Sequence, residues 1–197
     1  MSSRATEGAD KEDGERLPVI VVSGSPGSGK STIARALAER LGLRYLYTGD
    51  IFRSLARSLG VSVAELGRIA ERDPSIDLRI DKKTLEEAKR GGVVIDSHLA
   101  GWVLAGIADF SVYLKAPLAV RVKRVAGREK TSLSEALMDI VGREESQWRR
   151  FKALYGFDIT DLSVFDLVIE TSNYEPEEIV EIIINSLPRR VKARLHR

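Results

Sequence analysis

Gly24-Ser25-Pro26-Gly27-Ser28-Gly29-Lys30-Ser31 matches the pattern G-x-x-x-x-G-K-[ST] at every fixed position. The run before it, Pro18 to Ser23, reads P-V-I-V-V-S and predicts a short strand that is buried on both faces. After the loop, apolar residues recur at helical spacing from Ile33 to Leu41, and Gly42 ends the pattern. A strand, a glycine-rich loop and a helix in this order predict a phosphate-binding loop within an α/β fold.

The residue types in this loop suit a bound polyanion. Glycine lets several backbone N–H groups converge on phosphate, and the helix N-terminus adds its own N–H groups and dipole. We expect Lys30 to reach the β- and γ-phosphates and act in catalysis, and the Ser31 hydroxyl to bind Mg²⁺. An ordinary turn with a solvated lysine is the alternative. The expected ATP phosphate-binding residues are Gly24, Ser25, Pro26, Gly27, Ser28, Gly29, Lys30, Ser31 and Thr32.

The length and composition fit one globular domain of the cytoplasm. The 197 residues suffice for a single core with an appended lid. No cysteine is present, which excludes disulfides, thiolate catalysis and a cysteine-ligated zinc lid. The chain also lacks a long apolar run and an N-terminal hydrophobic segment, so we expect a cytoplasmic protein without membrane contact.

The two ends of the chain differ from the rest. Residues 1–17 are polar, carry mixed charge and lack periodicity, so a disordered leader is predicted. A single domain is expected over residues 18–188, followed by a basic tail over residues 189–197. The last ten residues hold five Lys or Arg and no acid, which fits a cationic helix end that matches the dipole. RNA or membrane contact by the tail is the alternative.

Four further apolar runs predict strands. They are Leu43–Tyr47, Val93–Asp96, Phe110–Lys115 and Phe165–Glu170. Helical patterns alternate with these runs, so we expect a five-stranded parallel sheet with helices on both faces. The long segment between the second and third strands, about residues 50–92, is mostly helical and is expected to form an insert.

Capping residues predict where the helices begin. Asp50 is expected to cap a helix from about Ile51 to Leu59, and Ser62 with Glu65 to cap the next. Further helices are expected over Ser75–Arg90, from the capping pair Ser132 and Glu135 with a bend at Gly142, and from Pro176 onward.

A second candidate phosphate site follows the second predicted strand, at Thr48-Gly49-Asp50-Ile51-Phe52-Arg53. Arg53 lies one turn into the following helix, where its guanidinium can hold a phosphate bidentately. A kinase needs such an anchor to hold the acceptor in line with the γ-phosphate. Asp96 ends the third predicted strand, at the sheet edge where open α/β sheets bind ligands. A solvated arginine early in a helix is the alternative for Arg53.

This segment resembles the G-D-x-x-R motif of nucleoside monophosphate kinases, in which the arginine binds the acceptor phosphate. Later stretches resemble the archaeal type of cytidylate kinase, and the resemblance extends from about Val19 to Leu187. It implies a P-loop kinase fold, with an acceptor-binding insert, that transfers a phosphoryl group from ATP to CMP, and to dCMP, with Mg²⁺. The stretches are Asp96-Ser97-His98-Leu99-Ala100-Gly101-Trp102, Arg143-Glu144-Glu145-Ser146, Tyr155-Gly156-Phe157-Asp158-Ile159 and Asp161-Leu162-Ser163-Val164-Phe165-Asp166-Leu167-Val168-Ile169.

The resemblance also implies roles for single residues. The expected monophosphate-binding residues are Thr48, Asp50, Arg53, Ser97 and His98. Asp96 would join Ser31 around Mg²⁺, directly or through water. One position departs from the pattern E-G-R-L-A-G-W of many members, because His98 stands in place of the arginine. The charge that this position brings to phosphate or base is therefore an open question.

A basic region over about residues 124–156 predicts a lid. From Val120 to Tyr155 the chain holds nine Lys or Arg against five Asp or Glu. Movable arginines that close over the phosphates would stabilise the transition state and exclude water. We expect Arg128, Arg143 and Arg150 to act in this way, and a solvated helix with i,i+4 ion pairs is the alternative. No general base is needed when the acceptor is already a phosphate dianion.

Two other functions remain open from the sequence. Adenylate kinase shares the phosphate loop and the G-D-x-x-R segment, and base preference depends on pocket shape. A P-loop regulatory or RNA-binding protein that uses the basic tail is a hypothesis from a different class. The favoured interpretation is a monomeric kinase whose partners are ATP and CMP or dCMP, with no nucleic-acid or membrane partner.

Overall fold

The computed structural model describes residues 16–195. The predicted disordered leader therefore falls mostly outside the described residues, as does the very end of the basic tail. The last two residues of the predicted leader, Arg16 and Leu17, contact the folded domain. Arg16 Nη1 donates a 2.9 Å hydrogen bond to the carbonyl oxygen of Ala88, and Gly92 N donates one of 3.0 Å to the carbonyl oxygen of Leu17. The folded domain thus begins two residues before the predicted boundary.

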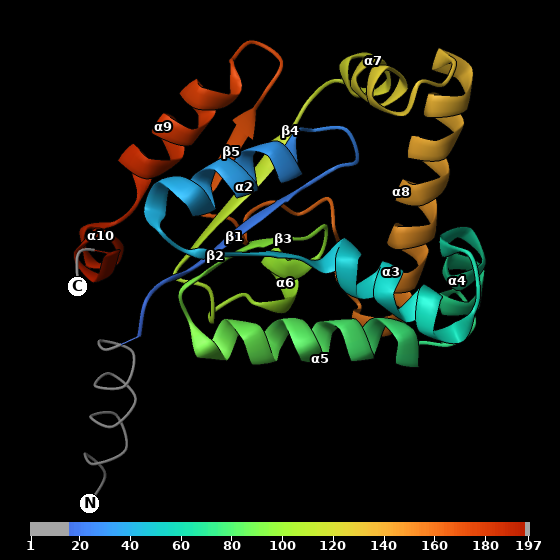
Figure 1. Cartoon of the computed structure of the whole chain (residues 1–197), viewed down its shortest axis with the longest axis horizontal. Coiled ribbons are helices and arrows are strands. Elements are labelled where there is room, and N and C mark those ends of the chain that lie inside the picture. The colour runs from blue at the N-terminus through green and yellow to red at the C-terminus, as the bar shows by residue number, and fades with distance from the viewer. Residues whose placement is uncertain (1–15, 196–197) are drawn as a thin grey trace, which may run out of the picture.

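A five-stranded parallel sheet lies at the centre of the molecule, which confirms the predicted fold class (Figure 1). The strands lie in the order β2-β3-β1-β4-β5, with β1 in the middle. β5 begins two residues later than predicted because Phe165 packs in an aromatic cluster rather than in the sheet. The strands are β1 (Val19–Gly24), β2 (Arg44–Tyr47), β3 (Val93–Asp96), β4 (Phe110–Lys115) and β5 (Leu167–Glu170).

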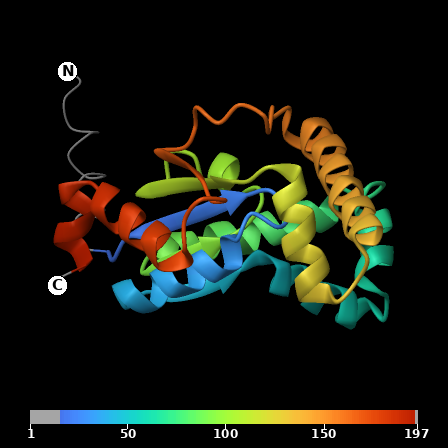
Figure 2. The same ribbon diagram turned by 90° about the horizontal axis from the view of Figure 1, so that it is seen from above.

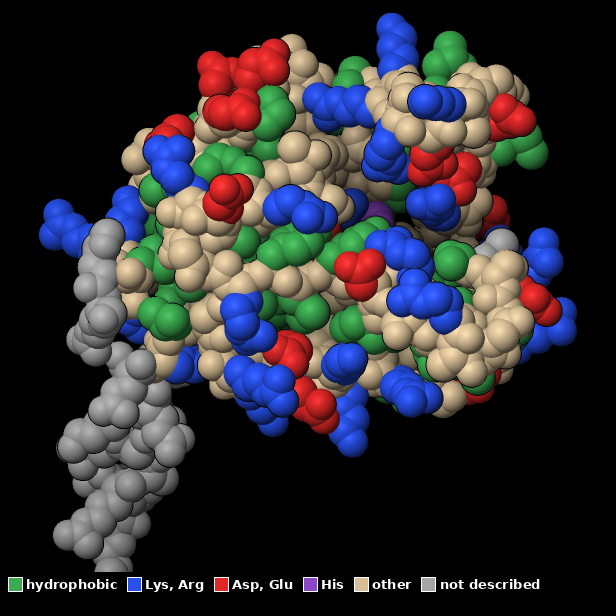
Figure 3. Space-filling view, in the orientation of Figure 1, with side chains coloured by type: hydrophobic (Ala, Val, Ile, Leu, Met, Phe, Trp, Pro, Cys, Tyr) green, Lys and Arg blue, Asp and Glu red, His purple; other side chains and the backbone are tan. Residues whose placement is uncertain are grey.

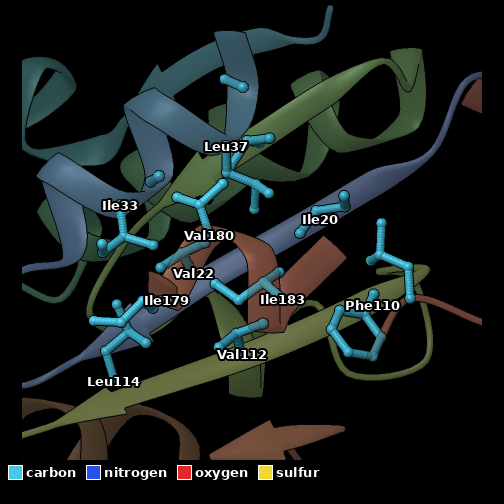
Figure 4. Packing of buried hydrophobic residues seen from close by; sticks show 14 of the residues in the cluster. Ile20, Val22, Ile33, Leu37, Phe110, Val112, Leu114, Ile179, Val180 and Ile183 are labelled. Atoms are coloured by element: carbon cyan, nitrogen blue, oxygen red, sulfur yellow. The ribbon is translucent and has the colours of Figure 1, made fainter. Parts of the chain in front are cut away.

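Helices cover both faces of the sheet. On one face, α2 (Lys30–Leu41) and α9 (Pro176–Ser186) pack over apolar residues that point alternately from the strands, among them Ile20, Val22 and Val112 (Figure 4). On the other face, α5 (Ser75–Arg90) and the short α6 (Ala100–Val103) cover Val19, Val21 and Ile95. β1 is therefore buried on both faces, and it delivers the glycine-rich loop from the rigid centre of the fold.

The predicted helical insert consists of α3 (Thr48–Leu59), α4 (Val63–Ala70) and α5. These helices share a small core of their own that includes Leu55, Leu66 and Ile80. One expectation is wrong, because α3 begins at Thr48 with Tyr47 as its N-cap. Asp50 therefore lies inside the first turn, where its charge favours the helix N-terminus, and does not cap the helix.

The region predicted to be a lid folds as α7 (Leu118–Glu129) and α8 (Leu133–Tyr155). A capping box between Ser132 and Glu135 begins α8, as predicted. The helix continues through Gly142, so the expected bend there is not observed. Figure 2 shows α7 and α8 at the end of the molecule opposite the C-terminal helix.

The basic tail is not a simple extension of α9. It folds as a separate helix, α10 (Arg189–Leu195), whose Val191 is fully buried. Arg194 pairs with Asp109, and the second oxygen of that carboxylate accepts a 2.7 Å hydrogen bond from Val19 N at the start of β1. Part of the positive charge of the tail is thus used inside the fold. None of the helices within residues 16–195 is long and apolar enough to span a membrane.

Candidate active site

The glycine-rich loop connects β1 to α2 and leaves no room for side chains at two of its glycines. A Cβ at Gly24 would lie 2.1 Å from the carbonyl oxygen of Leu114, and one at Gly27 would lie 2.9 Å from Arg121 Cβ. Gly29, the N-cap of α2, has a φ of 96°, a left-handed conformation that side chains disfavour. The loop is thereby held close to β4 and α7 with its backbone N–H groups at the helix N-terminus, where a phosphate binds readily.

Lys30, the first residue of α2, is buried beneath this loop. Its ammonium donates a 3.0 Å hydrogen bond to the carbonyl oxygen of Ser25. Burial lowers the pKa of Lys30 to about 8, and the negative charge of Asp96 opposes part of that shift. A buried ammonium with so little charge compensation is well suited to receive a polyphosphate.

Asp96 lies fully buried at the carboxyl end of β3. Its Oδ2 accepts a 2.9 Å hydrogen bond from Tyr45 Oη, whereas Oδ1 has no hydrogen-bond partner among residues 16–195. Burial raises the pKa of Asp96, and the charge of Lys30 and the hydroxyl of Ser31 counteract this shift. An unsatisfied carboxylate oxygen near a hydroxyl fits the oxygen ligands that Mg²⁺ prefers, so Asp96 and Ser31 could hold this ion.

A pocket of about 450 Å³ opens on one side of the loop. Arg124 forms part of the pocket wall. The guanidinium of Arg124 donates hydrogen bonds of 2.8 and 2.9 Å to Oγ1 and the carbonyl oxygen of Thr171. Arg128 also lines this donor-side pocket, and its side chain is 63% exposed beside Glu129. The other lining residues are Gly27, Ser28, Gly29, Lys30, Ser31, Thr32, Ile33, Thr171, Ser172, Tyr174, Glu175, Pro176 and Ile179.

A second pocket, of about 310 Å³, opens on the other side of the loop. Its walls come from the start of the loop, from α6 and β4, and from α8. In Figure 3 a histidine is visible in a hollow that Lys and Arg side chains border. The lining residues of this acceptor-side pocket are Gly24, Ser25, Pro26, His98, Trp102, Tyr113, Glu144, Gln147, Trp148, Phe151, Ile159, Thr160 and Leu162.

The residues expected to bind the monophosphate are not gathered at one point. Arg53 pairs with Asp50 at 2.7 Å, and its guanidinium lies 4.8 Å from the ring centroid of Tyr47. Thr48 Oγ1 lies 3.3 Å from the carbonyl oxygen of Asp96, at the junction of β3 and α3. Thr48, Asp50 and Arg53 do not line the acceptor-side pocket. The pair with Asp50 occupies Nη2 of Arg53, one of its three guanidinium nitrogens.

Ser97 and His98 follow β3 directly. The Ser97 hydroxyl accepts hydrogen bonds of 3.3 Å from the N–H groups of Leu99 and Ala100, so it supports the start of α6. His98 lines the acceptor-side pocket. Burial lowers the pKa of His98 well below its usual value, and the charge of Lys30 adds to this shift. His98 is thus neutral near pH 7 and does not supply the charge of the arginine that it replaces.

The three expected lid arginines occupy different surroundings. Arg128 lies near enough to Lys30 to lower the pKa of that residue, and Arg143 likewise acts on the pKa of His98. Arg143 also pairs with Asp139 on its own helix at 2.9 Å. Arg150 instead points at the insert, where its Nη1 lies 3.6 Å from Asp77. The structure therefore brings two of the three arginines toward the phosphate loop.

One arginine at the site did not stand out in the sequence. Arg121 is buried, and its Nη1 donates hydrogen bonds of 3.1 Å to the carbonyl oxygen of Pro26 and 2.7 Å to Glu144. It thereby connects the phosphate loop to α8. One indication of its burial was present in the sequence, since Arg121 lies one helical turn before the buried Val125.

Comparisons with known proteins show the family of the chain. A family model described as the cytidylate kinase-like family matches residues 19–173. The chain is 56% identical to a cytidylate kinase of Ignicoccus hospitalis, over 85% of this chain and 97% of that protein. It is 53% identical to a cytidylate kinase of Aeropyrum pernix, over 86% of this chain and 99% of that protein.

Two solved structures share the fold. One is shikimate kinase from Acinetobacter baumannii, with a TM-score of 0.55 and 23% identity, over 88% of this chain and 94% of that chain. The other is an uncharacterized protein from Eubacterium ventriosum, with a TM-score of 0.64 and 16% identity, over 87% of this chain and 98% of that chain. At these identities the likeness concerns the fold alone.

Proposed function

Because this chain belongs to the cytidylate kinase-like family, we propose that it transfers the γ-phosphoryl group of ATP to CMP, and to dCMP, giving CDP and dCDP. The observation that carries the proposal is the pair of pockets on either side of the glycine-rich loop. The donor-side pocket is lined by Gly27 to Ile33, and the acceptor-side pocket by Gly24 to Pro26. Two substrates can therefore meet at the same loop.

The donor phosphates would lie on the loop N–H groups and the N-terminus of α2. Lys30 would release the carbonyl oxygen of Ser25 and follow the charge of the γ-phosphate as the transfer proceeds. Arg128 and Arg143, both exposed enough to move, would approach from α7 and α8 and neutralise the transferring group. When bound between Ser31, Asp96 and the phosphates, Mg²⁺ would supply further positive charge.

The acceptor phosphate would face this group from the end of β2 and β3, with Arg53 as its anchor. An acceptor phosphate dianion already carries a nucleophilic oxygen, so no side chain has to remove a proton. The aromatic walls of the acceptor-side pocket, which include Trp102, Tyr113 and Phe151, offer stacking surfaces for a base. Positioning and charge neutralisation then account for the catalysis.

A panel of acceptors tests the proposal. The purified chain with ATP and Mg²⁺ is assayed with CMP, dCMP, UMP, GMP and AMP, and CMP is expected to have the highest kcat/KM. Equal or better turnover of AMP would overturn the assignment in favour of adenylate kinase. Absence of transfer to every monophosphate would overturn the proposed activity itself.

A further inference from the structure

Four charged or polar side chains meet where α8 packs against the insert. Arg150 and Tyr155 come from α8, and Asp77 and Asp81 lie one turn apart on α5. Arg150 Nη1 lies 3.6 Å from Asp77 Oδ1, and Tyr155 Oη donates a hydrogen bond to Asp81. The side chains of Arg150 and Asp77 are only 12% and 8% exposed.

Part of the hydrogen-bonding capacity of Arg150 is unused. Arg150 Nε and Nη1 are buried without a hydrogen-bond partner in the part of the chain that the structure describes. The separation of 3.6 Å from Asp77 is an ion-pair distance and is too long for a hydrogen bond. Burying a guanidinium in this state is costly, since two of its nitrogens give up water without a hydrogen bond in return. A buried polar group without a hydrogen-bond partner calls for an explanation, and a ligand that supplies the partner is one.

The cluster adjoins the acceptor-side pocket. Gln147 and Phe151 line that pocket from α8, and Arg150 lies between them in the chain, with its guanidinium 5.7 Å from the ring centroid of Phe151. Tyr155 packs against the aromatic cluster that holds Trp102 and Phe151, both of which line the pocket. Arg150 is thus positioned beside the pocket wall, on the side that faces the insert.

We propose that Asp77 and Arg150 read the base of the acceptor: the carboxylate accepts hydrogen bonds from the N4 amino group of cytosine, and the guanidinium donates to N3 and O2. This inference rests on the proposed function. The pattern of donor, acceptor, acceptor along the cytosine edge matches one carboxylate beside one guanidinium fork. It also gives Arg150 Nη1 a hydrogen-bond partner that the described part of the protein does not provide.

The same pair discriminates against the other bases. Uracil carries a carbonyl oxygen in place of the amino group and an N–H at N3, so it would face the carboxylate with an acceptor and the guanidinium with a donor. Adenine offers an amino group and a ring nitrogen but no counterpart of O2, and its fused ring is larger. Mismatched buried polar groups are rejected far more strongly than a missing methylene, because both sides are left unpaired.

Arg150 favours the charged form of Asp77, and Tyr155 holds the neighbouring Asp81. Burial raises the pKa of Asp77, and the charge of Arg150 opposes this shift. Burial likewise raises the pKa of Asp81 to about 6, and the charge of Asp77 adds to that shift. The hydrogen bond from Tyr155 holds Asp81 against α8. Asp77 is then the carboxylate with a cation beside it and with oxygens that are free to accept.

The competing interpretation is a structural contact that only fastens α8 to the insert. A third contact of this kind exists, because Ser146 Oγ donates a 2.6 Å hydrogen bond to Glu71 at the exposed surface. Glu71→Gln therefore serves as a matched control: it weakens a contact between the same two elements without touching the buried cluster. If the cluster only fastens α8 to the insert, substitutions in it should lower kcat/KM by the same factor for every acceptor. They should also lower the melting temperature.

The test compares kcat/KM for CMP, UMP and AMP in the full chain and in Asp77→Asn, Arg150→Lys and Glu71→Gln. The amide that Asp77→Asn introduces can donate to a uracil carbonyl, so we expect this variant to lower the ratio of CMP to UMP by about 10-fold or more. Arg150→Lys loses the planar fork, so KM for CMP should rise roughly 10-fold while KM for ATP stays within about 2-fold. Glu71→Gln should leave the ratio unchanged.

The outcomes separate the two levels of the proposal. If the unmodified chain phosphorylates CMP and neither variant changes the ratio of CMP to UMP, the base-reading role is wrong and the proposed function stands. If the unmodified chain does not phosphorylate CMP, the proposed function fails and this inference fails with it. Should Asp77→Asn not fold, as judged by circular dichroism, the selectivity of Arg150→Lys decides the question.

Discussion

The ammonium of Lys30 is bound to its own loop: its Nζ lies 3.0 Å from the carbonyl oxygen of Ser25, five residues earlier in the chain. The loop thus closes over the lysine, which is buried and whose charge is compensated mainly by Asp96.

Binding of ATP is expected to change the protonation of Lys30. Burial lowers the pKa of Lys30 to about 8, so the free protein prefers the neutral amine above that pH. The phosphates of ATP favour the ammonium and restore the higher pKa, so binding at pH 8 should take up about half a proton. Calorimetry in two buffers of different ionisation enthalpy measures this uptake. Identical enthalpies in both buffers, or the same uptake in Lys30→Met, would contradict the prediction.

Replacement of Lys30 is expected to slow turnover. Lys30→Met removes the charge that follows the γ-phosphate while it keeps an unbranched side chain of similar length. We expect kcat to fall by roughly 10² or more, because the lost contact strengthens in the transition state. Steady-state kinetics with saturating CMP gives the value. A kcat within a few-fold of the unmodified chain would remove the catalytic role of Lys30.

Arg53 is oriented by Asp50, which pairs with its Nη2, and by the ring of Tyr47, and its side chain is partly exposed. Arg53→Ala should therefore raise KM for the monophosphate by about 10-fold to 100-fold, since hydrogen bonds to charged groups are lost, and leave KM for ATP nearly unchanged. Arg57→Ala is the control, because it removes an exposed arginine one turn further along α3 and should leave both constants unchanged. A rise in the KM for ATP alone would contradict the assignment of Arg53 to the acceptor phosphate.

Arg121 connects the phosphate loop to Glu144 of α8. Arg121→Met should lower the free energy of unfolding by about 2 kcal/mol, less than for a fully buried pair because Glu144 is partly exposed. Adding Glu144→Gln should recover part of the loss, since the carboxylate is then no longer left without its cation. Urea denaturation of the two single variants and the double variant measures the coupling, and strict additivity would refute it.

Asp81 makes stability depend on pH. Burial raises its pKa from 3.8 to about 6, so the native state binds this proton more tightly than the unfolded chain. The associated stability is complete below pH about 4 and is lost as the pH rises through about 6. Asp81→Asn still accepts the hydrogen bond of Tyr155 and removes this titration. The Tm advantage of the variant should grow between about pH 4 and 7, and parallel Tm curves would show the prediction to be wrong.

Structural features that depend on a short stretch of sequence were predictable. The loop Gly24 to Ser31, the strand β1 before it and the cap at Ser132 each depend on residues that are neighbours in sequence. The errors arose where longer-range packing decides. Asp50 was expected to cap a helix, but Tyr47 already leaves β2 in an extended conformation and α3 begins at the next residue.

Arg150 and Arg121 show the same limit within the site. By spacing alone, Arg150 shares a basic helix with Arg143, and nothing local indicates that Asp77, in a helix far earlier in the chain, lies opposite it. Arg121 occupied a core-facing position in a run of valines, which is where a buried charge could have been recognised. Such partners become visible only when the insert and α8 are placed together.

The length of α8 has a mechanical consequence. Its 23 residues span about 35 Å, from the packing with α7 beside the donor phosphates to the insert that carries Arg53 (Figure 1). Ser146, Arg150 and Tyr155 fix its far half to the insert, and Arg121 with Glu144 ties its middle to the phosphate loop. Because α8 is one continuous helix, we expect any tilt of the insert to move Arg143, which α8 also carries, in the same direction.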